Sequence, residues 1–162
     1  MILADLDTTR ALGAALAEGL QAQGLPAGLL LFRGPLGAGK TTLIRALIAG
    51  LGVAGPVRSP TYTLIEPYPL AGGDLFHVDL YRLRNPAELD DLGFADLLDG
   101  RSLCLVEWPE RAPGLAGHAD LLIDMDVAGR LRKIAWEVRT GLGQALAAGL
   151  EACATTRRIT AV

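Results

Sequence analysis

The feature that most constrains this chain is the stretch LLLFRGPLGAGKTTL at residues 29–43. It begins with a short apolar run bounded by turn residues, which is typical of a buried parallel strand. A helix is predicted from about Gly39 to Gly50, because apolar residues recur there on one face. The turn between strand and helix matches the phosphate-loop spacing GxxxxGK[ST] at Gly34, Gly39, Lys40 and Thr41.

Each part of this stretch favours a bound phosphate. The glycines let backbone N–H groups turn inward, and the helix N-terminus adds a partial positive charge. Lys40 is expected to reach the β- and γ-phosphates of a nucleotide, and Thr41 to offer its hydroxyl to Mg²⁺. The stretch therefore predicts a nucleotide site rather than an ordinary glycine turn.

Length and charge limit what else the chain can contain. A chain of 162 residues that is 51% hydrophobic suits one compact domain with no separate substrate domain. We assign residues 1–150 to a single P-loop ATPase domain and residues 151–162 to a C-terminal tail, which we expect to be disordered. The net charge of −3 argues against an extended electrostatic contact with nucleic acid.

The cysteines and the apolar runs bear on location. Cys104 and Cys153 are too few and too poorly spaced for a disulfide framework or a zinc site, which fits a reducing compartment. The N-terminus has no basic segment before an apolar core, and no apolar run approaches the length of a membrane span. We expect a cytoplasmic protein that does not act at a membrane.

The order of predicted elements indicates an α/β P-loop NTPase fold with a central mixed, mostly parallel sheet flanked by helices. A first helix is predicted to begin with Asp7, Thr8 or Thr9 as its cap and to end before Gly24. The other predicted elements are a hairpin over 62–80, a helix over 85–99 that starts at Pro86 after the cap Asn85 and breaks at Gly93, a buried strand over 102–108, an extended pair over 119–139 and a closing helix over 141–152.

Two predicted strands end in a carboxylate. Asp79 closes LFHVD, and Glu107 closes LCLVE. Ligands of open α/β sheets lie beyond the carboxyl ends of the strands, so both acids are expected to face the phosphates and Mg²⁺. The pattern leaves open which acid touches the metal and which acts through a water.

Other residues carry weaker signals. SPTYT at residues 59–63 lies where switch-type NTPases have a nucleotide-sensing loop, although a turn that opens the next strand is an equal interpretation. His77 and His118 stand alone, and we assign them surface or core roles. Trp108 is expected to pack. Arg130 is a candidate for stabilising charge on a triphosphate.

Four blocks carry a resemblance to a known family, namely GPLGAGKTTL, SPTYTLIEPY, HVDLYRL and CLVEWPE. In this order and at these separations they resemble the TsaE family, bacterial P-loop ATPases required for threonylcarbamoyladenosine formation on tRNA. The resemblance covers roughly residues 6–140 and implies ATP and Mg²⁺ as cofactors. The residues it implies for nucleotide binding are Gly37, Ala38, Gly39, Lys40, Thr41, Thr42, Asp79 and Arg130.

The resemblance also implies individual roles. Thr41 and Glu107 are implied to bind Mg²⁺, and Asp79 is implied to lie near the γ-phosphate. Lys40, Asp79 and Glu107 are then the expected catalytic residues. The family's ATPase works with TsaB and TsaD, where TsaD transfers the threonylcarbamoyl group and the ATPase resets the complex between rounds. Contact with tRNA is expected only through that complex, and hydrolysis by the isolated chain is expected to be slow.

Other classes of protein share the phosphate loop. A small-molecule or nucleoside kinase remains an alternative, although it normally carries an Arg-rich lid and the chain has no Arg-dense insertion. A GTPase would need an NKxD-like stretch, which the sequence lacks. A module that only senses ATP also remains open.

Overall fold

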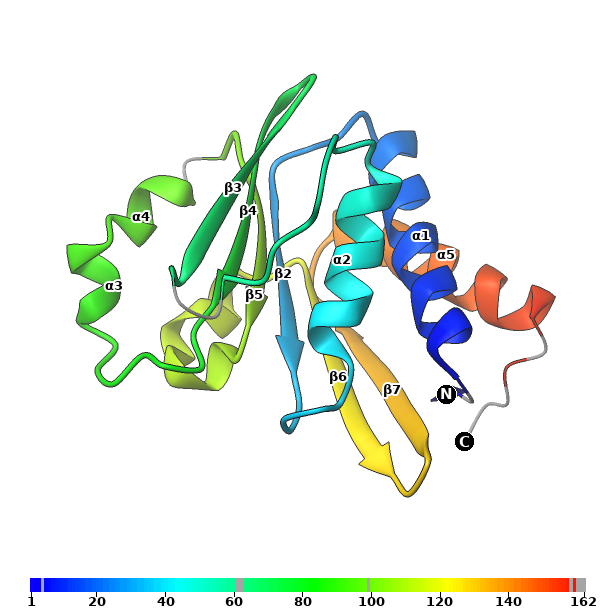
Figure 1. Cartoon of the computed structure of the whole chain (residues 1–162). Helices are drawn as coiled ribbons and strands as arrows, with labels where there is room; N and C mark the ends of the chain where they lie inside the picture. Colours follow the sequence, from blue (N-terminus) through cyan, green and yellow to red (C-terminus); the bar gives the residue numbers. More distant parts are fainter. Residues whose placement is uncertain (4, 61–62, 99, 158, 160–162) are drawn as a thin grey trace.

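A seven-stranded sheet runs through the protein in the order β1-β7-β6-β2-β5-β4-β3 (Figure 1). The computed structural model describes residues 1–3, 5–60, 63–98, 100–157 and 159. The strands are β1 (Ile2–Leu3), β2 (Gly28–Arg33), β3 (Ile65–Leu70), β4 (Gly73–Asp79), β5 (Leu103–Glu107), β6 (Leu121–Ala128) and β7 (Leu131–Val138).

The sheet is mixed, as predicted, but its parallel part is confined to the centre. The pairs β6/β2, β2/β5 and β5/β4 are parallel, whereas β1/β7, β6/β7 and β3/β4 are antiparallel. The expectation of a mostly parallel sheet is therefore too strong. Two hairpins, β3–β4 and β6–β7, and the short strand β1, which the sequence did not reveal, supply the antiparallel pairs. The parallel centre brings the carboxyl ends of β2, β4 and β5 to one edge.

Helices cover both faces of the sheet. They are α1 (Leu6–Ala22), α2 (Lys40–Gly50), α3 (Glu88–Asp91), α4 (Phe94–Leu97) and α5 (Gly141–Thr156), with 3-10 turns η1 (Pro109–Arg111) and η2 (Pro113–His118). Figure 1 shows α1, α2 and α5 grouped together, and α3 and α4 at the other end of the view.

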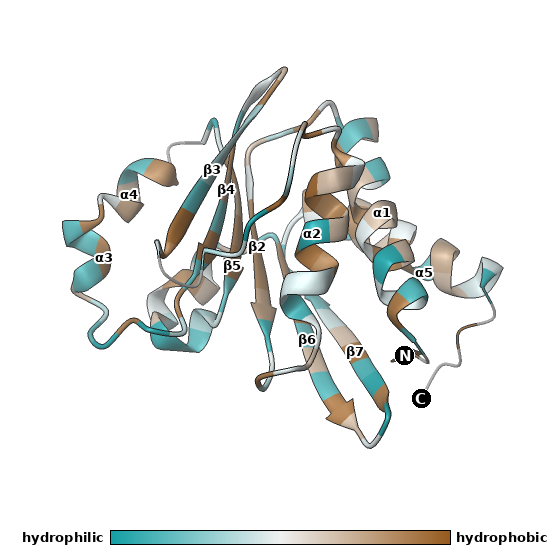
Figure 2. Cartoon of the chain, in the orientation of Figure 1, coloured by the Kyte–Doolittle hydropathy of each residue, from teal (hydrophilic) through white to brown (hydrophobic). Residues whose placement is uncertain are grey.

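Alternate residues of β2 belong to two apolar cores. Leu30 and Phe32 pack with residues of α1, α2 and α5, whereas Leu29 and Leu31 pack with residues of α3, α4 and η2. Successive side chains of a strand point to opposite faces, so β2 is buried on both sides. Figure 2 shows the corresponding hydrophobic colour along the central strands. This burial fixes the strand that leads into the phosphate loop.

The first helix is capped earlier in the chain than predicted. Asp5 is extended and is the N-cap of α1; its side chain accepts hydrogen bonds from the backbone N and the hydroxyl of Thr8, at 2.7 and 2.6 Å. Asp7 lies inside the first turn and pairs with Arg10. The prediction of Asp7, Thr8 or Thr9 as the cap is wrong, because the carboxylate of Asp5 accepts the hydrogen bond from the backbone N–H of Thr8.

The hairpin and the interrupted helix are confirmed with altered starts. β3 begins at Ile65 because Leu64 has a left-handed backbone with φ 64°. The predicted strand start at residue 62 lies outside the described residues. The helix over 85–99 breaks at Gly93 as predicted, but α3 begins at Glu88 rather than Pro86. Asn85 instead accepts a hydrogen bond from the N–H of Ala87 at 3.1 Å.

The closing helix extends into the predicted tail. α5 runs through Thr156, so residues 151–156 are helical rather than disordered. Leu150 and Ala154 of this helix are buried, which explains why it continues past residue 150. Residues 158 and 160–162 lie outside the described part of the chain. No helix among the described residues is long and apolar enough to cross a membrane.

Candidate functional site

The phosphate loop passes against the neighbouring strand β6. Gly34 has φ 137°, and a Cβ built on it would lie 1.9 Å from the carbonyl oxygen of Met125. Gly39 has φ 105° and is the N-cap of α2. Both positions therefore need glycine, Gly34 for space and both for backbone conformation. The strand, loop and helix occur in the predicted order, and α2 begins at Lys40.

Lys40 is buried at the base of this loop, with 4% of its surface exposed. Its Nζ donates to the carbonyl oxygens of Gly34 and Pro35, at 2.6 and 3.1 Å. The same atom lies 3.8 Å from the ring centroid of Trp108. Burial lowers the pKa of Lys40, while the nearby carboxylates, Glu107 first among them, act in the opposite direction. A cation in this position attracts a phosphate oxygen strongly because little water screens it.

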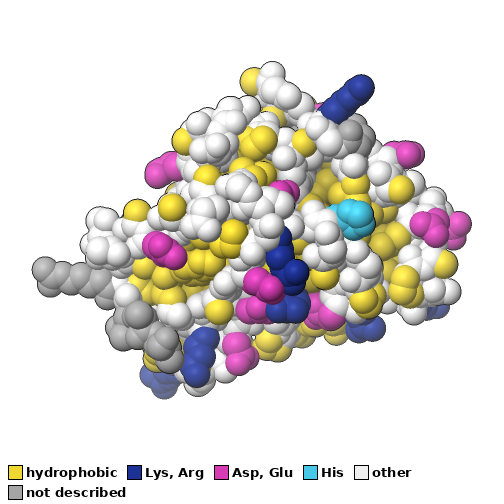
Figure 3. All heavy atoms as spheres, turned by 180° about the vertical axis from the view of Figure 1, so that it is seen from behind, with side chains coloured by type: hydrophobic (Ala, Val, Ile, Leu, Met, Phe, Trp, Pro, Cys, Tyr) yellow, Lys and Arg dark blue, Asp and Glu magenta, His cyan; other side chains and the backbone are white. Residues whose placement is uncertain are grey.

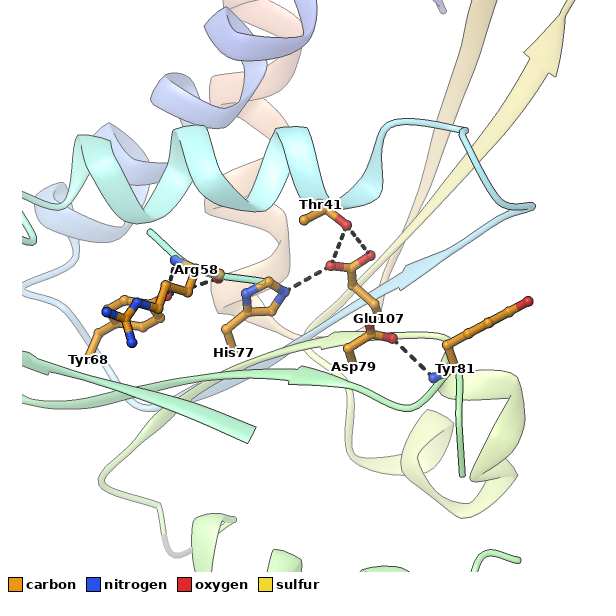
Figure 4. A network of polar contacts seen from close by, with 7 residues as sticks. All are labelled: Thr41, Arg58, Tyr68, His77, Asp79, Tyr81 and Glu107. Carbon is orange, nitrogen blue, oxygen red and sulfur yellow. Dashed lines mark hydrogen bonds and ion pairs between the residues drawn. The ribbon is translucent and has the colours of Figure 1, made fainter. Parts of the chain in front are cut away.

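The two strand-end acids are neighbours, as predicted. Asp79 of β4 and Glu107 of β5 are register partners at the carboxyl ends of their strands. The hydroxyl of Thr41, in the first turn of α2, lies 2.9 Å from Oε1 and 2.8 Å from Oε2 of Glu107 (Figure 4). The structure thus joins the loop hydroxyl directly to Glu107.

Asp79 is nearly buried, with 6% of its surface exposed. Its Oδ1 accepts a hydrogen bond from the backbone N of Tyr81 at 3.1 Å. Burial raises the pKa of Asp79; the bond from Tyr81 acts against that increase, whereas the charge of Glu107 adds to it. The two carboxylates therefore have different partners. Asp79 accepts from a backbone N–H group, whereas Glu107 contacts the hydroxyl of Thr41.

Trp108 does more than pack in the core. It has a left-handed backbone with φ 60°, and its backbone N–H donates to the carbonyl oxygen of Phe32 at 3.2 Å. Its ring lies 4.9 Å from the ring of Tyr81 at an interplanar angle of 50°, and it also faces the ammonium of Lys40. The two rings and the lysine form one wall of the site.

His77 was assigned a core or surface role, and the structure places it beside a predicted site residue. Its side chain is fully buried, and Nε2 lies 2.9 Å from Oε1 of Glu107. The signal in the sequence was the alternation HVD: His77 and Asp79 are two residues apart on β4 and share a face of the sheet. His118 is exposed, in agreement with a surface role.

Two arginines of the β6–β7 hairpin reach the loop from the other side. Arg130 lines a pocket of about 220 Å³ together with Gly37, Ala38 and Thr42. Arg132, which the sequence did not single out, lines the same pocket, and its Nε donates to the carbonyl of Gly37 at 3.1 Å. Arg130 lies in the turn before β7 and Arg132 lies on the strand two residues later, so GRLRK carried a signal for the second arginine.

A cavity of about 320 Å³ opens where the predicted residues meet. The residues that line it are Leu36, Gly37, Gly39, Lys40, Thr41, Thr42, Asp79, Tyr81, Glu107 and Trp108. Thr41 and Glu107 supply oxygen atoms, the ligands that Mg²⁺ prefers. Within the described part of the chain no group of three His, Cys, Asp or Glu could enclose a metal. The site thus fits an ion that takes its remaining ligands from phosphate and water.

The segment before β3 is tied to the sheet by Tyr68. The backbone N of Arg58 donates to the hydroxyl of Tyr68 at 2.9 Å, and that hydroxyl lies 3.1 Å from the carbonyl oxygen of Arg58. Burial raises the pKa of Tyr68, while the hydrogen bond with the backbone of Arg58 acts against that increase. Residues 61–62 lie outside the described residues, so a sensing loop at 59–63 stays a prediction.

Comparison with known proteins gives consistent matches. The family described as threonylcarbamoyl adenosine biosynthesis protein TsaE matches residues 3–134. The chain is 44% identical over 116 residues to the tRNA threonylcarbamoyladenosine biosynthesis protein TsaE of Haemophilus influenzae, covering 72% of this chain and 73% of the relative. The protein of the same name from Synechocystis is 42% identical over 118 residues, covering 70% and 71%. The crystal structure of YdiB from Bacillus subtilis matches with a TM-score of 0.72 and 27% identity, covering 94% of this chain and 93% of that chain.

Proposed function

The chain belongs to the TsaE family, whose members serve in tRNA threonylcarbamoyladenosine biosynthesis, and from that premise we propose that it is a Mg²⁺-dependent ATPase. One observation carries the proposal. Lys40 and Thr41 from the phosphate loop, and Asp79 and Glu107 from two strand ends, line one cavity of about 320 Å³. The absence of an NKxD-like stretch from the sequence supports ATP over GTP.

We assign the phosphates to this cavity. The amides of Gly37 and Gly39 and the N-terminus of α2 favour anions there. Lys40 supplies the positive charge between the β- and γ-phosphates. The pocket with Arg130 and Arg132, which shares Gly37, Gly39 and Thr42 with the cavity, is proposed to take the rest of the nucleotide.

Thr41 and Glu107 are the proposed holders of Mg²⁺. When bound, Mg²⁺ would neutralise charge on the phosphate oxygens during transfer. The shared hydrogen bond already places the hydroxyl and the carboxylate within 2.9 Å of each other. Asp79, held by the N–H of Tyr81, is proposed to orient the attacking water and accept its proton.

We further propose that a partner completes the site. Leu36 and Tyr81 line the phosphate cavity and are 75% and 41% exposed, so they offer apolar surface at the cavity that a partner can cover. By resemblance, the partner is the TsaB–TsaD complex, and hydrolysis resets that complex between rounds. The formal net charge of −3 supports contact with tRNA only through the complex. On the face shown in Figure 3, the basic side chains do not gather into one patch.

The proposal also places the protein in the cytoplasm. Cys104 and Cys153 are not joined in a disulfide, as expected of a reducing compartment.

Phosphate release by the purified chain tests the proposal. We expect slow turnover by the chain alone and an increase of about tenfold or more when TsaB and TsaD are added, because groups supplied by a partner stabilise transition-state charge. Fast turnover alone that the pair does not change would overturn the coupling to a partner. If the chain binds ATP but does not hydrolyse it, either alone or with TsaB and TsaD, it is a nucleotide sensor rather than an ATPase.

A further inference from the structure

His77 is a buried imidazole with one polar partner and one bare nitrogen. Nε2 lies 2.9 Å from Oε1 of Glu107, and neither side chain is more than 2% exposed. Nδ1 is also buried and has no hydrogen-bond partner among the described residues. A buried polar atom without a partner is rare in a folded protein, so this arrangement needs a physical explanation.

The lack of a partner for Nδ1 determines which ring nitrogen carries the proton when the ring is neutral. A proton on Nδ1 would be a buried donor without an acceptor, which is costly. It would also leave the lone pair of Nε2 facing the lone pairs of the Glu107 carboxylate. A proton on Nε2 avoids both problems, because Nε2–H then donates to Oε1 and only an acceptor is left bare at Nδ1.

Glu107 is consequently held from two sides. The Thr41 hydroxyl approaches from α2, and the His77 ring approaches from β4, on the strand next to that of Glu107 (Figure 4). A glutamate side chain has several rotamers, and two partners on different elements restrict it to one. We propose that His77 is a positioning residue that fixes the Glu107 carboxylate through an Nε2–H hydrogen bond, so that it meets Mg²⁺ beside Thr41.

This inference rests on the proposed role of Glu107 toward Mg²⁺. Residues that orient a ligand commonly change metal affinity by about 10- to 100-fold when they are lost. His77 does not itself line either cavity, but it contacts Glu107, which lines the larger one, so its effect on the metal is proposed to act through Glu107.

The ring proton can be observed without nucleotide or metal. The chain has two histidines, and the variant His118→Gln leaves His77 as the only one. ¹⁵N NMR of the full chain with labelled histidine should show a protected proton on Nε2 and an unprotonated Nδ1. A proton on Nδ1 with a bare Nε2 would overturn the proposal.

Binding then tests the consequence for the metal. The variant His77→Leu removes the donor, whereas His77→Gln keeps an amide N–H at a similar reach. Titration calorimetry with a non-hydrolysable ATP analogue, in Mg²⁺ and in EDTA, measures how much Mg²⁺ strengthens binding. We expect His77→Leu to reduce that gain about tenfold or more, with binding in EDTA unchanged, and His77→Gln to restore most of it.

The controls separate this inference from the proposed function. If the wild-type chain shows no gain from Mg²⁺, the proposed metal role fails, while the NMR result still decides the hydrogen bond. An unchanged gain in His77→Leu would overturn the positioning role. In a Glu107→Gln background, His77→Leu should not further reduce the gain in affinity that Mg²⁺ provides. An additional loss there would show that His77 acts by general destabilisation, which would also overturn the proposal.

Discussion

The hydroxyl oxygen of Thr41 lies 2.8 Å from one carboxylate oxygen of Glu107 and 2.9 Å from the other. Thr41 stands in the first turn of α2, and Glu107 closes β5, so the contact joins the phosphate loop to the neighbouring parallel strand. The two oxygen-bearing groups therefore lie next to each other, which limits the reorganisation that Mg²⁺ binding would require.

Glu107→Ala should weaken nucleotide binding about tenfold or more in Mg²⁺ and leave binding in EDTA nearly unchanged, because the carboxylate contributes only through the metal. Glu110→Ala is the control, since Glu110 is exposed and does not line the cavity. Titration with an ATP analogue, in Mg²⁺ and in EDTA, measures the affinity of both variants. Equal losses with and without Mg²⁺ would contradict a metal-binding role for Glu107.

Lys40→Ala should reduce phosphate release by about 100-fold or more, because it removes the buried charge between the β- and γ-phosphates. Weak nucleotide binding through the loop amides should remain. Lys133→Ala on β7 is the matched control, since Lys133 is exposed and lines neither cavity. Turnover in Lys40→Ala equal to that of the wild type would remove the basis for the P-loop assignment.

Asp79→Asn should slow hydrolysis by about 100-fold and at the same time stabilise the fold at neutral pH. Asparagine keeps an oxygen that can accept the hydrogen bond from the N–H of Tyr81, while the charged oxygen is replaced by a neutral amide group. Hydrolysis is followed as phosphate release. The stability of both proteins is followed by urea unfolding.

The pH dependence of that stability difference follows from the raised pKa of Asp79. The folded protein binds a proton at Asp79 at higher pH than the unfolded chain does, so the ionised carboxylate destabilises the fold above the folded-state pKa. This destabilisation declines as the pH falls through the folded-state pKa and vanishes below the unfolded-state pKa. The advantage of Asp79→Asn should therefore shrink in acid; an advantage that grows in acid would have the wrong sign.

Gly34→Ala should destabilise the protein by about 2 kcal/mol or more, because the new methyl group would overlap the carbonyl of Met125 and the backbone would be strained. Gly114→Ala in η2 is the control, since a Cβ there meets nothing within 4 Å. Thermal unfolding compares the two. Equal melting temperatures would mean that the loop shifts away from β6 at little cost.

The sequence by itself determined the local features of the site. The apolar runs before Gly34, Asp79 and Glu107, and the spacing of the loop, are properties of short segments. Burial and backbone conformation act on such segments in any fold that contains them. For this reason the phosphate loop, both hairpins and the two strand-end acids could be predicted from the sequence.

Only the tertiary structure decided which distant residues meet. His77 lies against Glu107, 30 residues away, and Arg132 donates to Gly37, 95 residues away. These contacts depend on strand order and register, and a shift of one residue in β4 or β7 would turn each side chain to the opposite face of the sheet. Register is set by the burial of whole strand faces and by the hairpin turns, so no single stretch of sequence specifies it.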